Sequence, residues 1–156
     1  MTAASSITIR RARREDVAAI VGMLADDPLG SGRERIEDPL PELYYRAFER
    51  VDRDPNVQLV VAMDGEGGVV GCLQLAVMPG LSSQGTSRGL LEDVRVAKHC
   101  RSRGIGEQLV QWAVTEARAN GCVLVELLTH HTRVDAQRFY ERLGFARSHV
   151  GMMLRF

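Results

Sequence analysis

The sequence predicts a mixed α/β (α+β) fold, in which a mostly antiparallel central sheet is flanked by helices. Two observations on element order predict it. A strand pattern and two helical patterns open the chain, and three strand patterns then follow with only short connections between them. The second half continues with helix, strand, helix and further strand-like sequence. Short connections favour antiparallel neighbours, whereas an intervening helix permits a parallel crossover.

The first elements are predicted from hydrophobic periodicity. Ile7–Arg11 alternates apolar and polar residues, as a half-buried edge strand does. Apolar residues at helical spacing predict helices over Asp16–Ala25 and Glu42–Val51. Residues 26–39 between them are rich in Gly, Pro and charged residues and predict a loop.

Three consecutive strands are predicted in the middle of the chain. Val57–Met63 and Val69–Met78 flank Asp64–Gly68, and the Asp and Gly residues of that segment are a strong hairpin-turn signal. After a loop over residues 79–85, Ser87–Val96 is the third strand. We therefore expect an antiparallel meander.

The second half begins with a predicted helix over Gly104–Asn120, which Gly121 ends. The nearly continuous apolar run Val123–Leu128 predicts a strand in the middle of the sheet.

The C-terminal part is predicted to hold a short helix and terminal β structure. Thr132 and Asp135 resemble a capping pair for a helix that runs to Leu143. Ala146–Phe156 is expected to form β structure, with a hairpin around Gly151.

Length and composition limit the classes of protein. The 156 residues fit one domain, 1–156, and the formal net charge is zero, which argues against nucleic acid as the main partner. No apolar run approaches the roughly 18 residues that a membrane span needs. Cys72, Cys100 and Cys122 have the spacing of neither a disulfide framework nor a zinc site, so we expect no metal and a reduced, cytoplasmic protein.

A strand–loop–helix segment carries the chemical signal. The predicted strand ends at Val96, and a glycine-rich loop precedes the next helix. Glycines allow close approach of backbone N–H groups, and a helix N-terminus adds unsatisfied N–H groups and a positive dipole. Such an arrangement suits a pyrophosphate. The candidate residues are Arg101, Ser102, Arg103, Gly104, Ile105 and Gly106.

This segment resembles motif A of the GCN5-related N-acetyltransferase (GNAT) family, an Arg or Gln followed by x-x-Gly-x-Gly or Ala after a strand. The run Phe139–Phe145 (FYERLGF) is similar to the family's FYEKLGF element, and the intervening helix and strand have appropriate lengths. The resemblance covers residues 87–147; the N-terminal part agrees in element order only. It implies the GNAT fold and acetyl-CoA as donor.

The resemblance also implies roles for individual residues. Backbone groups of Val94 and Val96 would hold the acetyl carbonyl and the pantetheine arm, and the amides of residues 101–106 would hold the pyrophosphate. Tyr140 matches the tyrosine that protonates the leaving thiolate. Arg133 stands where many members have an Asn that contacts the cofactor arm, a departure from the family pattern.

The attacking amine must lose a proton, and Glu92 is the candidate general base. Strand alternation predicts that Glu92 lies on the same side as Val94 and Val96 and that Asp93 faces the other way. A water relay, or His130 or His131 just after the strand at residues 123–128, are alternatives.

The acceptor is expected to be a small-molecule amine. The resemblance implies that residues 26–45 shape its site, and acidic residues and arginines are mixed there. The alternatives are a protein N-acetyltransferase and a non-catalytic acetyl-CoA sensor. A homodimer through the C-terminal segment is possible.

Overall fold

The computed structural model describes residues 6–156. The chain forms two compact units, Met1–Glu126 and Leu127–Phe156, and each is described by itself. The expectation of one domain over 1–156 stays a prediction. The elements are β1 (Thr8–Arg11), η1 (Arg14–Asp16), α1 (Val17–Ala25), α2 (Glu42–Arg53), β2 (Val57–Met63), β3 (Val69–Met78), α3 (Ser82–Gly85), β4 (Ser87–Val96), η2 (Lys98–Cys100), α4 (Ile105–Ala119), β5 (Cys122–Leu127) and α5 (Val134–Arg142).

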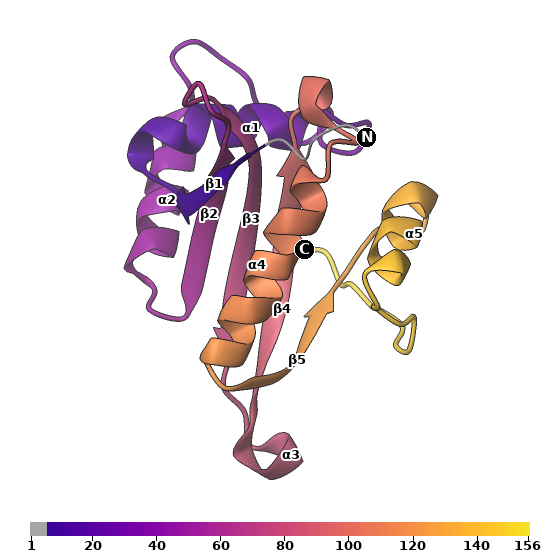
Figure 1. Ribbon diagram of the computed structural model, residues 1–156. Helices are drawn as coiled ribbons and strands as arrows, with labels where there is room; N and C mark the ends of the chain where they lie inside the picture. The colour runs from indigo at the N-terminus through magenta and orange to yellow at the C-terminus, as the bar shows by residue number, and fades with distance from the viewer. Residues whose placement is uncertain (1–5) are drawn as a thin grey trace. The chain divides into compact units, whose positions relative to one another are not determined.

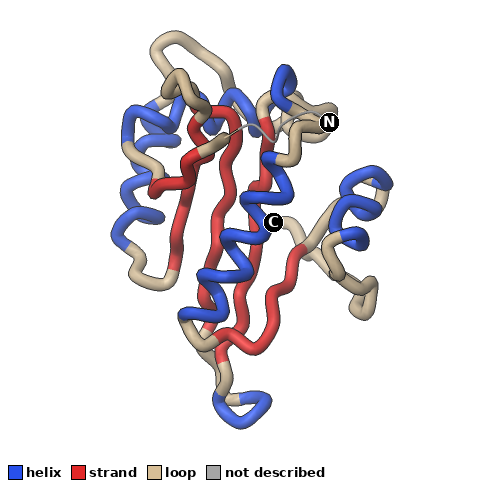
Figure 2. The backbone as a smooth tube through the Cα atoms, in the orientation of Figure 1, coloured by secondary structure: helices blue, strands red, loops and turns tan. Residues whose placement is uncertain are grey.

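In the part of the chain that the structure describes, the strands form a five-stranded sheet of order β1-β2-β3-β4-β5 (Figure 2). The pairs β1–β2, β2–β3 and β3–β4 are antiparallel. Because α4 returns the chain along the sheet, β5 runs in the same direction as β4 (Figure 1). The predicted mixed, mostly antiparallel sheet is confirmed.

Helices cover both faces of this sheet. On one face, a Cβ added to Gly71 would lie 3.0 Å from Leu109 Cδ1, and one added to Gly89 would lie 3.2 Å from Ala117 Cβ, so α4 packs directly on the strands. On the other face, Cys72 clusters with residues of α1 and α2, among them Ile20, Met23 and Phe48. Successive residues of a strand point to opposite faces. Gly71 therefore points to the face of the sheet that α4 covers, called the α4 face, and Cys72 points to the opposite face, called the α1/α2 face.

The β2–β3 turn forms as the sequence predicts. The Asp64 carboxylate accepts hydrogen bonds from the amides of Glu66 (3.0 Å) and Gly68 (2.7 Å). Gly67 has φ +85°, a conformation that glycine adopts without steric cost.

A buried carboxylate ties the turn η1, which leads into α1, to β1. Asp16 is only 4% exposed and accepts hydrogen bonds from Arg10 Nη1 (2.7 Å), Arg10 Nη2 (3.0 Å) and the Arg13 amide (2.7 Å). Burial of the carboxyl favours its neutral form, but the hydrogen bonds from Arg10 and Arg13, together with the positive charges of these two arginines, outweigh burial and lower the pKa of Asp16.

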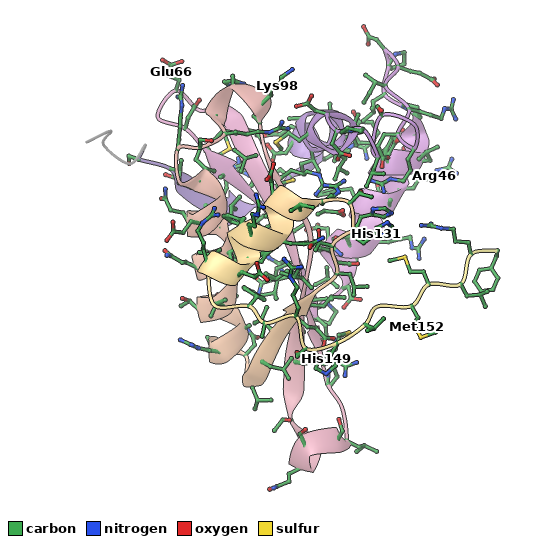
Figure 3. The ribbon with its side chains drawn as sticks, turned by 90° about the vertical axis from the view of Figure 1, so that its right-hand side faces the viewer. Arg46, Glu66, Lys98, His131, His149 and Met152 are labelled. Carbon is green, nitrogen blue, oxygen red and sulfur yellow. The ribbon has the colours of Figure 1, made fainter. Side chains whose placement is uncertain are left out.

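Two strand predictions are wrong. The run Val123–Leu128 does not lie in the middle of the sheet, because β5 is an edge strand on which Val123 is 60% exposed. No strand is present in residues 146–156, so the hairpin around Gly151 does not form; Figure 3 draws the tail around Met152 as an extended trace. Apolar patterning alone makes no strand, because a strand also needs a neighbour for its backbone hydrogen bonds.

The capping prediction for α5 is also wrong. The N-cap residue is Arg133 and makes no side-chain capping bond. The Thr132 hydroxyl lies 2.7 Å from His130 Nδ1 instead, which takes it away from the helix start. Among the described residues, no helix is long and apolar enough to cross a membrane.

Candidate active site

The central feature of β4 is a bulge at Asp93. Cys72 pairs with Arg95 and Gln74 pairs with Glu92, so two residues of β4 stand opposite Leu73 alone. Asp93 has φ +52°, and its carbonyl accepts a 3.4 Å hydrogen bond from Cys72 Sγ. A bulge takes backbone groups out of the sheet ladder and bends the strand. It thereby makes backbone groups at this point of β4 available to a ligand.

The bulge overturns the predicted side of Glu92. Cross-strand partners share a face. Glu92 therefore lies on the face of Gln74, and Arg95 on that of Cys72, which is the α1/α2 face in both cases. Val96 is opposite Gly71 and lies on the α4 face.

Val94 precedes Arg95 and shares the face of Val96, so Glu92 and the two valines point to opposite sides. Simple alternation fails because it assumes an unbroken ladder. Glu92 is exposed, and its carboxylate accepts a 3.3 Å hydrogen bond from Gln74 Nε2.

Asp93 acts electrostatically on groups of the α1/α2 side. Burial raises the pKa of the Cys72 thiol to about 12, and the Asp93 charge adds to that shift. Asp93 also helps to raise the pKa of Arg33, for which the hydrogen bond to Glu34 is the largest cause. The prediction that Asp93 faces the other way from Glu92 rested on the same alternation and loses its basis. The buried Cys72 thiol stays protonated near neutral pH.

The glycine-rich loop contains two residues at positive φ directly before α4. After β4 and η2, Ser102 has φ +61° and Gly104 has φ +77°. The 15-residue helix α4 starts directly afterwards, with Gly104 as its N-cap and Ile105 only 2% exposed. Residues with positive φ turn successive amides toward one point, and the helix dipole adds positive potential there.

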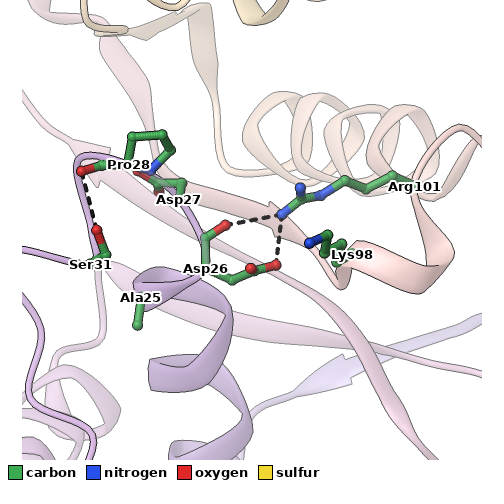
Figure 4. Close-up of a pocket in the computed structure, with 7 residues that line it drawn as sticks. All are labelled: Ala25, Asp26, Asp27, Pro28, Ser31, Lys98 and Arg101. Atoms are coloured by element: carbon green, nitrogen blue, oxygen red, sulfur yellow. Dashed lines mark hydrogen bonds and ion pairs between the residues drawn. The ribbon is translucent and has the colours of Figure 1, made fainter.

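The Arg101 side chain is turned toward the loop after α1. Its Nη2 donates to Asp26 Oδ2 (3.0 Å) and to the Asp26 carbonyl (3.2 Å) (Figure 4). Its Nε donates to the Val96 carbonyl (3.2 Å). A cavity of about 390 Å³ lies beside this contact. The lining residues are Ala25, Asp26, Asp27, Pro28, Ser31, Lys98 and Arg101.

The second unit holds the remaining candidates. The half-buried Tyr140 ring contacts the rings of Phe139 (5.0 Å between centroids) and Phe145 (5.7 Å), so packing fixes its orientation on α5. Arg133 is the N-cap of the same helix. His130 and His131 are exposed, and both backbone carbonyls accept hydrogen bonds from Gln137 Nε2.

Sequence reasoning missed two features of the site. It found the carboxylates of β4 but not the bulge, for which an Asp at positive φ leaves no clear trace in one sequence. It found the Arg101 motif but not its partner Asp26, which is 75 residues away in the chain. No group of three or more potential metal ligands occurs in the described residues.

Comparison with known proteins supports an acyltransferase. The acetyltransferase (GNAT) family model matches residues 14–145. The aminoalkylphosphonate N-acetyltransferase of Salmonella typhimurium is 40% identical over 112 residues, which cover 69% of this chain and 71% of that protein. The glucosamine 6-phosphate N-acetyltransferase of Trypanosoma brucei brucei is 33% identical over 87 residues, 56% of each chain.

A solved structure is similar over nearly the whole chain. It is described as a transcriptional regulator from Bacillus halodurans and is 48% identical, with a TM-score of 0.93, over 97% of this chain and 100% of that one. The family model covers residues 14–145, and this range includes the antiparallel strands β2–β4 and the strand–loop–helix segment of β4 and α4. This chain therefore belongs to the acetyltransferase (GNAT) family and is an acyltransferase.

Proposed function

We propose that this protein transfers the acetyl group of acetyl-CoA to the primary amine of a small molecule, by direct attack of the amine on the thioester. One observation supports this most. The bulge at Asp93 and the positive-φ turn at Ser102 and Gly104 lie in one continuous strand–loop–helix segment. The first suits an extended acyl arm that binds to strand backbone, and the second suits a pyrophosphate.

In this proposal the donor binds mainly to backbone groups. Those of Val94 and Val96 would hold the acetyl carbonyl and the pantetheine arm, and the amides of Arg101–Gly106 would hold the pyrophosphate. Arg133 would contact the arm in place of the usual Asn. When bound, acetyl-CoA supplies an activated acyl carbon and a thiolate leaving group.

Glu92 remains the proposed general base. Its side chain and those of Val94 and Val96 point to opposite faces, but strand N–H and C=O groups lie near the plane of the sheet. A carboxylate on the α1/α2 face can therefore approach an acyl carbon that is held in that plane. Glu92 would take the proton of the attacking amine, directly or through water.

Tyr140 is the proposed general acid. Its hydroxyl would give a proton to the departing thiolate, so that the products are the amide and the CoA thiol. A neutral thiol leaves far more easily than a thiolate beside a neutral amine, because the proton removes the developing negative charge.

We infer that the acceptor carries a phosphonate or phosphate besides its amine. The names of the Salmonella and Trypanosoma relatives contain such compounds. In this chain, Arg33 and Arg35 lie in the loop between α1 and α2 and pair with Glu34 (2.9 Å) and Glu37 (2.6 Å). Forked guanidinium groups bind such anions well. The anion would take the place of these neighbouring carboxylates.

We further propose a cytoplasmic protein that works without nucleic acid or membrane. The zero net charge supports the first exclusion, and the free cysteines support a reducing compartment. A homodimer is a further proposal, supported by the exposed apolar side chains of the tail, such as Met152 and Leu154.

Calorimetric titration with acetyl-CoA tests the proposal, followed by a thiol-release assay over a panel of amines. The panel should contain aminoethylphosphonate, glucosamine 6-phosphate, a polyamine and a lysine peptide. We expect binding, and fastest turnover with an amine that carries phosphorus. Fastest turnover of the peptide would instead support a protein acetyltransferase.

The description of the Bacillus relative as a regulator favours one second candidate, an acetyl-CoA sensor without turnover. Tight binding of acetyl-CoA, with no thiol release on any amine, would support that sensor. Retention on heparin or DNA at moderate salt would then show whether nucleic acid is a partner. Absence of acetyl-CoA binding would contradict both candidates.

A further inference from the structure

Two consecutive acidic residues directly after α1 tie the loop over residues 26–41, called the acceptor loop below, to the strand–loop–helix segment of β4 and α4. Asp26 binds Arg101, which follows η2, and Asp27 lies 3.6 Å from Arg95, which belongs to β4. The two arginines flank the connection from Val96 to Cys100. The loop over residues 26–41 is therefore anchored on both sides of the connection that leads into the proposed pyrophosphate cradle.

Arg101 makes the outer of these two contacts, and its contacts are directional. One guanidinium group bridges the Asp26 carboxylate, the Asp26 carbonyl and the Val96 carbonyl, at 3.0 to 3.2 Å. The side chains of Arg101 and Asp26 are 48% and 42% exposed. The Arg101 guanidinium thus links Asp26, directly after α1, to Val96 at the end of β4. Both side chains of the Arg101–Asp26 ion pair remain accessible to water.

The loop continues from this anchor in a fixed turn. Asp27 Oδ1 accepts hydrogen bonds from the amides of Leu29 (2.8 Å) and Gly30 (2.9 Å). Further along, Tyr44 of α2 accepts a 2.8 Å hydrogen bond from the Arg35 amide. Displacement of Asp26 would therefore shift the first part of a loop that carries Arg33 and Arg35.

We propose that Asp26 is a positioning residue for acceptor binding that acts through Arg101. The Arg101 guanidinium holds the acceptor loop against the end of β4 and does not bind the pyrophosphate, which backbone amides of the loop hold. The inference rests on the proposed acetyl transfer, because it concerns where the acceptor binds in that reaction.

Kinetics of Asp26→Asn, Arg101→Gln and the double variant test this role. We expect each to raise the KM for the acceptor about fivefold, near the upper limit for one exposed ion pair, with kcat and the Kd for acetyl-CoA nearly unchanged. The double variant should be no worse than Arg101→Gln alone, because that substitution already removes the contact with the Asp26 carboxylate. Asp26→Glu, which keeps a carboxylate, should recover most of the loss.

Acetyl-pantetheine as donor separates the two possible roles of Arg101, because it lacks the pyrophosphate. The increase in acceptor KM should persist with this donor. If the Arg101→Gln defect appears only with acetyl-CoA, or as a weaker Kd for it, then Arg101 binds the pyrophosphate and the proposal is wrong. Glu49→Gln is the matched control, since it breaks the Arg14–Glu49 pair, whose side chains are 52% and 47% exposed.

A measurement without turnover distinguishes this inference from the proposed function. Amide hydrogen exchange in the ligand-free protein should speed up over residues 27–37 in both single variants and stay unchanged in Glu49→Gln. Unchanged exchange in the Asp26 and Arg101 variants would contradict the anchoring. If the wild-type protein acetylates no amine, the proposed function is contradicted. Faster exchange over residues 27–37 in the Asp26 and Arg101 variants would still support the anchoring in that case.

Discussion

At the scale of single residues, the candidate site depends on side chains whose surroundings suit their proposed roles. The Tyr140 ring makes edge contacts with the rings of Phe139 and Phe145, and Glu92 lies next to a strand bulge with a 3.3 Å hydrogen bond from Gln74. A proton-transfer group has to be positioned by packing and yet be free to exchange its proton. Two substitutions test these roles.

Tyr140→Phe removes the hydroxyl and keeps the ring. We expect kcat to fall by at least about tenfold, because the thiolate would leave without a proton donor. The Kd for acetyl-CoA should change little, since the ring contacts with Phe139 and Phe145 remain. Pre-steady-state thiol release and calorimetry measure the two quantities. An unchanged kcat would exclude Tyr140 as the acid.

Glu92→Gln removes the proposed base without a change in size. The rate should fall most at low pH, where little free amine exists and base assistance matters most. Asp93→Asn, which removes the neighbouring carboxylate, is the control. Any fall in the rate of this variant should be the same at every pH. A Glu92→Gln profile parallel to that of the wild type would favour water or a histidine as the base.

At the scale of elements, hydrophobic periodicity predicts that the helices α1 and α4 form but does not show which residues hold their N-terminal ends in place. The Asp16 carboxylate accepts a hydrogen bond from the backbone N–H at the start of η1, the turn that leads into α1, and Gly104 is the N-cap of α4. Both residues lie where the chain must satisfy or redirect helix-end amides. Their substitutions should therefore affect different properties, stability in one case and binding in the other.

Asp16→Asn should destabilise the protein by about 2 kcal/mol at neutral pH, because charge-assisted hydrogen bonds are lost. The Asp16 pKa is lowered in the folded state. Its contribution is therefore complete above the pKa of the unfolded chain and is lost as the pH falls through the folded-state pKa. Urea unfolding should give a constant difference between wild type and variant from pH 7 to about pH 5, which shrinks below about pH 4. A difference that grows on acidification would contradict this role.

Gly104→Val should abolish acetyl-CoA binding while the domain stays folded. A β-branched residue is strained at φ +77°, and relief of that strain would turn the cradle amides away. Gly104→Asn is the informative comparison, because Asn tolerates this conformation, and should keep most of the affinity. Circular dichroism checks folding and calorimetry measures the Kd. Tight binding by the Val variant would mean that the loop is not the cradle.

At the scale of the whole molecule, α4 links the core to the candidate site. Leu109 is fully buried against the sheet, and the same helix begins at the proposed pyrophosphate cradle. The close approach requires glycine at Gly71, where an added Cβ would meet Leu109 Cδ1 at 3.0 Å and the Arg95 carbonyl at 3.1 Å.

Gly71→Ala should therefore lower the free energy of unfolding by about 1–3 kcal/mol, through overpacking between α4 and β3. Gly65→Ala is the matched control, because nothing lies within 4 Å of a Cβ there, and it should be nearly neutral. Thermal and urea unfolding provide the comparison. Equal stability of the two variants would show that α4 can shift without cost.

Periodicity and local chemistry were sufficient for most of the fold. The strands at residues 57–63, 69–78 and 87–96 and the hairpin turn at Asp64–Gly68 depend on contacts between near neighbours, and all were confirmed. Motif patterns likewise led to the family before any geometry was known. Such features are encoded within short stretches of chain, so one sequence reveals them.

Only the tertiary structure decided the edge position of β5, the side on which Glu92 lies and the partner of Arg101. Each depends on segments far apart in the chain: the order of strands, the bulge opposite Leu73, and the end of α1. The sequence of an apolar strand is the same whether it pairs with one neighbouring strand or with two. Likewise, the sequence around a polar residue does not show which distant residue it contacts. The sequence by itself determined the elements and the family, whereas packing decided which of their residues meet.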